Sequence, residues 1–113
     1  MEHHIKNAYL SLITESQQLT TVTEKWPAIG LIEDPSENVQ LAAVTQDGCA
    51  IEFIEAPSEE IQIVAVTQNG HAIQDIKDPS EKVQLVAVTR NGHAVTYIED
   101  PSKAVKRAAG LGT

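Results

Sequence analysis

The sequence predicts an all-α fold, an α–α solenoid of tandem 22-residue helix–turn–helix repeats with a cap at each end. Four prolines recur at a constant interval of 22 residues, at Pro35, Pro57, Pro79 and Pro101. The segments that they open align without gaps, as residues 34–55, 56–77 and 78–99 and a shortened segment, 100–113. Each full segment opens on a helix-start pattern and carries a glycine near its middle, which indicates two helices joined by a turn.

The N-terminal part is expected to form a cap and a divergent repeat within residues 1–33. Gln18-Leu19 aligns there with Gln40-Leu41, whereas Trp26-Pro27 replaces the glycine turn. Apolar residues at helical spacing are expected to cover the first repeat, at Ile5, Tyr9, Leu12 and Ile13.

The last segment, residues 100–113, is predicted to be a C-terminal capping helix. Arg107 and Gly110 stand there in positions that hold leucine and valine in the segments 34–55 and 78–99. A terminal repeat needs a polar outer face, and these two changes are of the expected kind.

The first helix of each repeat is predicted to begin at an aspartate and to end at a glycine. The expected N-caps are Asp34, Asp78 and Asp100. A proline follows each at the first helical position, where its missing N–H costs nothing. A glutamate at the third position can reach back to the cap, at Glu37, Glu59 and Glu81. The helices are expected to end near Asp47-Gly48, Asn69-Gly70 and Asn91-Gly92, where glycine can take the left-handed conformation and asparagine can cap the next helix.

The second helix of each repeat is expected to be about two turns long, too short to be stable alone. The first helix carries a nearly continuous apolar stretch, such as Leu41-Ala42-Ala43-Val44, which predicts an inner helix sandwiched between repeats. The second has a narrow apolar stripe, so the positions between are expected to face water, at Glu52, Gln74 and Thr96.

A β-hairpin is the alternative interpretation. Asn-Gly flanked by β-branched residues is a strong hairpin signal, and VQLVAVTRNGHAVTYI could form two strands. The apolar runs lack period-2 alternation, however, and the Asp-Pro-Ser-Glu openings are helix starts. The pattern therefore favours helices.

The unit PSExVQLxAVTxNGHAIxxI resembles the short paired-helix repeats of bacterial and bacteriophage proteins grouped as domains of unknown function. The resemblance covers residues 34–109 and implies an α-helical repeat fold. It implies no catalytic residue.

Composition and length indicate a small soluble domain. A chain of 113 residues can form one core but not a core with a deep catalytic cleft. The lone Cys49 excludes an internal disulfide and fits a reducing compartment. No apolar run approaches the ~20 residues that cross a bilayer. Met1-Glu2-His3-His4 lacks the basic start of a signal peptide, so a cytoplasmic location is expected.

The net charge of −8 is unevenly distributed. Residues 100–113 carry three cations against one carboxylate, which leaves −10 on residues 1–99. Such a surface repels nucleic acid and anionic membranes, so neither is expected as a direct ligand. A partner protein with a basic or mixed surface is compatible with it.

No catalytic residue, cofactor or metal site is predicted. Cys49, His71 and His93 occupy equivalent positions and are expected to stack as a ladder. Neighbouring helix axes lie roughly 8–10 Å apart, too far for these side chains to share a hydrogen bond or a metal ion. Identical glutamines and threonines are predicted to bond to the backbone of the next repeat, at Gln40, Gln62, Gln84, Thr45, Thr67 and Thr89.

Positions that differ between repeats are the candidates for partner binding. They are Phe53, Asp75 and Tyr97; Gln46, Gln68 and Arg90; and His71 and His93. Phe53 and Tyr97 either cover the core or, if exposed, anchor an interface. The predicted function is a non-catalytic protein–protein interaction module, in which a homodimer is possible.

The alternative function is an acidic inhibitor, possibly encoded by a phage, of a host nucleic-acid-binding or defence enzyme. Carboxylates recur at the junctions between repeats, at Glu33-Asp34, Glu55, Asp78 and Glu99-Asp100. Such a ridge either serves capping and solubility or imitates a nucleic-acid backbone.

Overall fold

All the regular structure in the computed structural model, which describes residues 12–111, is helical. The α-helices are α2 (Glu15–Glu24), α3 (Glu37–Gln46), α4 (Glu59–Gln68), α5 (Glu81–Arg90) and α6 (Lys103–Ala108). Each of the first four is followed by a 3-10 helix: η2 (Trp26–Leu31), η3 (Gly48–Phe53), η4 (Gly70–Asp75) and η5 (Gly92–Tyr97). No strand occurs among the described residues, so the helical prediction is confirmed and the hairpin interpretation is wrong.

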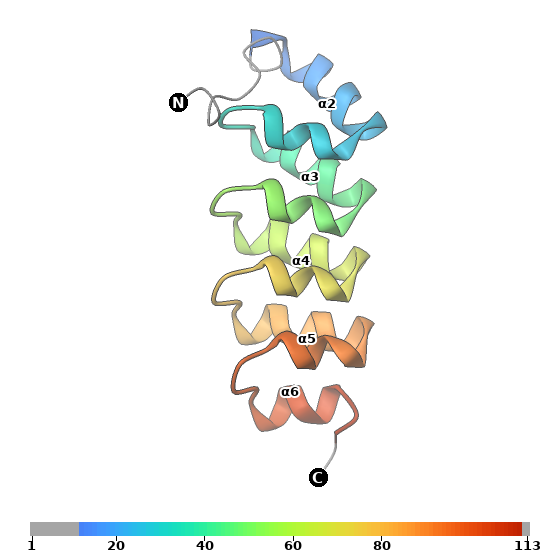
Figure 1. Cartoon of the computed structure of the whole chain (residues 1–113), viewed down its shortest axis with the longest axis vertical. Coiled ribbons are helices and arrows are strands. Elements are labelled where there is room, and N and C mark those ends of the chain that lie inside the picture. The colour runs from blue at the N-terminus through green and yellow to red at the C-terminus, as the bar shows by residue number, and fades with distance from the viewer. Residues whose placement is uncertain (1–11, 112–113) are drawn as a thin grey trace.

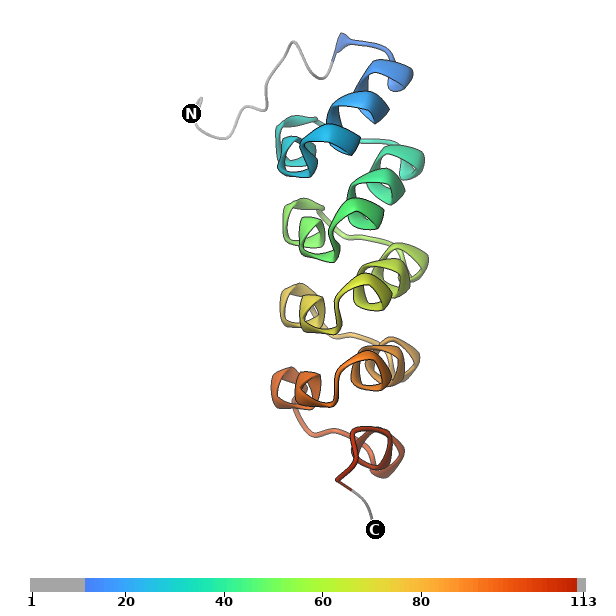
Figure 2. The same cartoon turned by 90° about the vertical axis from the view of Figure 1, so that its right-hand side faces the viewer.

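Successive helix pairs stack along the long axis of the molecule in the same order as in the sequence (Figure 1). The α-helices form one column and the 3-10 helices a second, parallel column (Figure 2). Each α-helix contacts the next α-helix, and each 3-10 helix contacts the next 3-10 helix. The chain therefore has two layers of helices, with the core between them.

Serines begin the helices α3 to α6, and the prediction of aspartate caps is wrong. The side chains of Ser36, Ser58, Ser80 and Ser102 each accept a hydrogen bond from the backbone N–H three residues later. The aspartates stand two residues earlier, and with Ala56 they adopt φ of 49–54°. A residue before proline is excluded from the right-handed helical region, and aspartate tolerates the left-handed one. The repeated glutamates consequently occupy the first helical position, not the third.

The predicted helix ends are correct, because Asp47, Asn69 and Asn91 are the C-caps of α3, α4 and α5. The same three side chains cap the following 3-10 helix by accepting a hydrogen bond from the N–H two residues later. One residue thus closes one helix and opens the next.

The expectation of left-handed glycines at these turns is wrong, since positive φ occurs at no described glycine except Gly110. Close packing requires glycine there instead. A Cβ atom added at Gly48 would lie 2.2 Å from the carbonyl oxygen of Ala65 in the next α-helix. At Gly70 the corresponding distance, to the Ala87 oxygen, would be 2.7 Å. These glycines allow successive helix pairs to approach each other.

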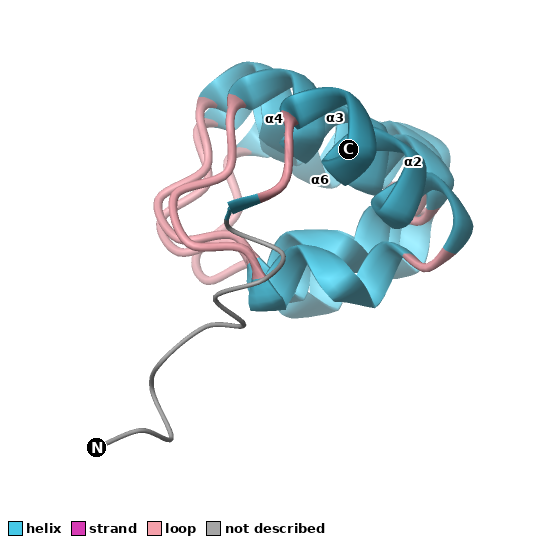
Figure 3. Ribbon diagram, turned by 90° about the horizontal axis from the view of Figure 1, so that it is seen from above, coloured by secondary structure: helices cyan, strands magenta, loops and turns pink. Residues whose placement is uncertain are grey.

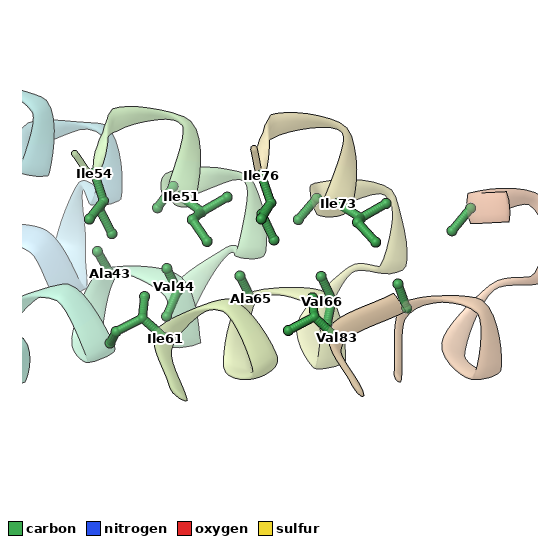
Figure 4. Packing of buried hydrophobic residues seen from close by; sticks show 14 of the residues in the cluster. Ala43, Val44, Ile51, Ile54, Ile61, Ala65, Val66, Ile73, Ile76 and Val83 are labelled. Carbon is green, nitrogen blue, oxygen red and sulfur yellow. The ribbon is translucent and has the colours of Figure 1, made fainter. Parts of the chain in front are cut away.

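Small and β-branched side chains fill the core between the two layers (Figure 4). Ile51 and Ile73 point from the 3-10 helices toward Val44 and Val66 of the α-helices, and all four are buried. The first helix is not buried on every side, because Leu41, Ile63 and Leu85 are only partly buried. Glu52, Gln74 and Thr96 are exposed, as predicted.

The described ends of the stack differ. Gly110, at φ 86°, ends α6: the N–H of Leu111 donates to the Lys106 oxygen, and that of Gly110 to the Arg107 oxygen. Arg107 and Gly110 are exposed. At the other end Leu12 is 84% exposed and covers nothing, while Ile5 and Tyr9 lie outside the described residues.

Candidate interaction surface

The structure places the eight candidate residues at two opposite edges of the stack. Gln46, Gln68 and Arg90 are the last residues of their α-helices, and His71 and His93 follow directly after the tight turn. Phe53, Asp75 and Tyr97 are the last residues of the 3-10 helices, which run back toward the long loops (Figure 3). His71 is partly buried and the other seven are exposed. They do not form one continuous site.

Two grooves open at the edge that carries the long loops. The first groove, of about 310 Å³, is lined by Glu33, Asp34, Pro35, Gln40, Phe53, Ile54 and Glu55. The second groove, of about 330 Å³, is lined by Ile76, Asp78, Pro79, Gln84, Tyr97, Ile98 and Glu99. Six positions of the first groove, all but Glu33, recur 44 residues later in the second, with one helix pair between the grooves. The grooves differ at the seventh position, because Lys77 stands at the position equivalent to Glu33.

The loop that borders each groove is held by a glutamine. Gln40 Nε2 donates to the carbonyl oxygen of Pro35 at 3.0 Å, and Gln84 Nε2 donates to that of Pro79 at 2.9 Å. These bonds satisfy partly buried carbonyls that precede the helices. The prediction that the glutamines bond to the next repeat is therefore wrong. It also fails for Thr67, whose hydroxyl donates to the Ile63 oxygen of its own helix.

An aromatic ring forms one wall of each groove and is supported from behind. The ring of Phe53 packs on Trp26 at a centroid distance of 6.2 Å, and that of Tyr97 packs edge-on against His71 at 5.5 Å. Phe53 is nevertheless 38% exposed and Tyr97 is 43% exposed. Each ring is thus held on one side and open to solvent on the other. Of the two predicted alternatives, covering the core or being exposed, the structure shows exposure for both rings.

Four carboxylates at the grooves have no internal counter-charge. Asp34 and Glu55 in the first groove, and Asp78 and Glu99 in the second, form no ion pair within residues 12–111. The intervening helix pair differs at the same positions, where it has Ala56, Asp75 and Lys77. Two grooves with an aromatic ring and these carboxylates therefore flank a level that has no aromatic ring and carries a lysine.

Asparagine side chains link the 3-10 helices at the opposite edge. Asn69 Nδ2 donates to Cys49 Sγ at 3.5 Å, and Asn91 Nδ2 lies 3.0 Å from His71 Nε2. The Oδ1 atom of Asn91 accepts a hydrogen bond from the His93 N–H, so the Nδ2 atom faces His71. Cysteine and histidine thus bind asparagines of the next helix pair and not each other.

The environment of Cys49 does not activate the thiol. Burial raises the pKa of Cys49 first of all, and the nearby carboxylate of Asp47 raises the pKa further. The Asn69 hydrogen bond lowers the pKa but is the smallest contribution. A thiol that stays protonated is a poor nucleophile.

A ladder between serines and glutamates was not anticipated from the sequence. The hydroxyls of Ser58, Ser80 and Ser102 donate to Glu37, Glu59 and Glu81 of the preceding helix at 3.2, 2.6 and 2.7 Å. Ser36 donates in the same way to Glu15. The signal was available: a hydroxyl residue followed by glutamate occurs in each segment up to Ser80-Glu81, and lysine replaces the glutamate at Ser102-Lys103.

Residues 12–111 contain no group of three or more His, Cys, Asp or Glu side chains that could hold a metal ion. Within this part of the chain, no helix combines the length and apolarity that crossing a membrane requires. No family model, curated protein or solved structure matches the chain. The resemblance to short paired-helix repeats therefore stays a prediction.

Proposed function

We propose that the chain is a solenoid of tandem 22-residue repeats that acts as a non-catalytic protein–protein interaction module. The observation that carries this proposal is the pair of equivalent grooves, each with a supported and exposed aromatic ring. Aromatic residues held in place beside a pocket are typical anchors of protein interfaces, since little side-chain entropy is lost on binding. A partner from a reducing compartment such as the cytoplasm fits the free thiol of Cys49.

The division between constant and variable positions supports the proposal. Constant residues bond within or between helix pairs, as Gln40 and Ser58 do, and so maintain the stack. The variable residues Phe53 and Tyr97 are exposed to solvent at the grooves. Repeat proteins use such positions for recognition because substitutions there leave the framework intact.

The acidic inhibitor is the second candidate function, and four carboxylates that form no ion pair favour it, at Asp34, Glu55, Asp78 and Glu99. A row of carboxylates without internal counter-charges can compete with phosphates for a basic groove on an enzyme. This function requires binding that weakens steeply with salt and competes with DNA or RNA. Binding through the aromatic rings is less sensitive to salt, because burial of apolar surface is not screened.

Capture of partners on the immobilised chain tests both candidates. Nuclease-treated lysate of the source cells is passed over the wild-type chain and over a Phe53→Ala/Tyr97→Ala variant, at low and at high salt. A protein that binds the wild type, is lost from the variant and is not released by DNA or RNA supports the interaction module. A nucleic-acid-binding protein held only at low salt, and released by DNA or RNA, supports the inhibitor.

The Asp75→Ala variant is the matched control, because it changes the equivalent exposed position outside the two grooves. Circular dichroism and thermal unfolding show whether each variant keeps the fold. If the wild type and the double variant retain the same proteins at each salt concentration, the grooves are not the interaction surface and the proposed function is wrong.

A further inference from the structure

We propose that the two grooves together bind an extended peptide segment of a partner protein through two arginine side chains, one in each groove. This inference rests on the proposed interaction function and specifies the chemistry of the partner. It follows from what each groove contains, from the spacing of the grooves and from the different helix pair between them.

Each groove combines the two features that a guanidinium group recognises. The face of Phe53 or Tyr97 can stack on the planar cation, and the unpaired carboxylates can accept its N–H groups in pairs. Arginine fits this combination better than lysine, because the guanidinium is planar, presents a fork of donors and is more weakly hydrated. Groove volumes of about 310 and 330 Å³ leave room for the aliphatic stem as well.

The stack sets the separation between the two arginines. The grooves lie two helix pairs apart, and neighbouring helix axes are roughly 8–10 Å apart, which gives a separation on the order of 16–20 Å. An extended chain advances about 3.3 Å per residue, so the two arginines should stand about five or six residues apart. The peptide would run along the loop edge, parallel to the long axis of the stack (Figure 1).

The intervening helix pair offers no third arginine site. Asp75 replaces the aromatic ring, and Lys77 stands where Glu55 and Glu99 stand in the grooves. A peptide arginine at this point meets no aromatic ring, and Lys77 offsets the charge of Asp75. Position within the peptide, and not total charge, should therefore decide affinity.

Binding of synthetic peptides, measured by fluorescence anisotropy, tests the inference. The peptides share one composition, two arginines among glycines and serines, and differ only in the separation between the arginines. We expect the affinity to peak at about five or six residues of separation. At the peak it should exceed that of a peptide with a single arginine by about 100-fold, because the second contact is intramolecular.

Two single variants assign the contacts. Phe53→Ala and Tyr97→Ala should each remove one contact, so the best peptide should fall to roughly the affinity of the single-arginine peptide. Asp75→Ala should leave the affinity within about twofold, since surface positions away from the contact rarely matter. Replacing both arginines by lysine should weaken binding about tenfold, as expected when bidentate and stacking contacts are lost.

An affinity that does not depend on the arginine separation, or an equal loss in Asp75→Ala and Tyr97→Ala, would overturn the inference. So would the absence of measurable binding by every peptide. If the lysate experiment nevertheless identifies a partner lost from the Phe53→Ala/Tyr97→Ala variant, the interaction function stands and only the arginine chemistry is wrong. If the peptides bind as expected but no partner is found, the grooves are confirmed and the proposed function is not.

Discussion

Replacement of the turn glycines by alanine tests how closely the helix pairs approach. An added Cβ would lie 2.2 Å from the Ala65 oxygen in Gly48→Ala, 2.7 Å from the Ala87 oxygen in Gly70→Ala, and 3.0 Å from the Ala109 oxygen in Gly92→Ala. Cβ atoms essentially never approach another atom more closely than 3.0 Å. Ordinary contact begins at 3.4 Å, so the carbonyl oxygen must move away by 1.2 Å (3.4 − 2.2) in Gly48→Ala, by 0.7 Å (3.4 − 2.7) in Gly70→Ala and by 0.4 Å (3.4 − 3.0) in Gly92→Ala.

The expected destabilisation follows this order. Overpacking of a close contact costs about 1–3 kcal/mol, and the closest contact is with a backbone oxygen that cannot rotate away. Against it stands a gain of about 0.4–1 kcal/mol, because alanine restricts the unfolded chain. We expect a loss of about 2 kcal/mol for Gly48→Ala and about 1 kcal/mol for Gly70→Ala, and a change near zero for Gly92→Ala.

Urea and thermal unfolding followed by circular dichroism measure these differences. A loss of about 2 kcal/mol should lower Tm by roughly 8 °C in a chain of this size. Since none of the three glycines has a positive φ, backbone strain contributes equally little to each variant. Three equal losses, or a larger loss for Gly92→Ala than for Gly48→Ala, would refute the argument that interhelical contact selects glycine.

Three further predictions concern the helix starts and the thiol. Ser80→Ala should destabilise the chain by about 1–2 kcal/mol, because it removes the N-cap of α5 and the hydrogen bond to Glu59. A double-mutant cycle with Glu59→Gln, measured by urea unfolding, should show coupling between Ser80 and Glu59. Ala56→Asp should raise the unfolding free energy by about 1 kcal/mol, since alanine at φ 49° is strained where aspartate is tolerated; a decrease would contradict this. Alkylation of Cys49 by iodoacetamide should be slower at neutral pH than that of an unstructured cysteine and should rise only at higher pH, because its pKa is raised. Asp47→Asn should shift this pH–rate profile to lower pH, and an unchanged profile would exclude the carboxylate as a cause.

The sequence was sufficient to predict the order of helices and most of their ends. The constant interval between prolines and the glycine turns placed both helices of each pair, because these signals depend on local backbone chemistry. Asn69 and Asn91 were identified as caps for the same reason. The short helices were predicted in place, although their 3-10 geometry was not.

Contacts between helix pairs could not be derived from the sequence, since they depend on how two pairs meet in space. Glu37 illustrates this: its position three residues after Asp34 suggested that it reaches back to an aspartate cap, whereas its carboxylate accepts a hydrogen bond from Ser58 of the next pair. Gly48 is a second case: a left-handed conformation was expected there, whereas glycine is required because a Cβ atom would lie 2.2 Å from the Ala65 oxygen. The grooves were missed likewise, because Gln40 and Phe53 lie thirteen positions apart in the chain but line one cavity.

The pattern of variation supports a two-point contact at the loop edge. If stacking alone governed the sequence, each position would tend toward one residue type in every helix pair. Core positions behave in this way, as Val39, Ile61 and Val83 do with one kind of side chain. Three positions around the grooves instead change chemical class together in the middle pair: aspartate to alanine, aromatic to aspartate and glutamate to lysine, at Ala56, Asp75 and Lys77. The stack would tolerate the same residues at all three levels, since these side chains are exposed. A ligand that touches the first and third levels and spans the second accounts for this alternation, whereas a uniformly acidic surface kept for solubility does not.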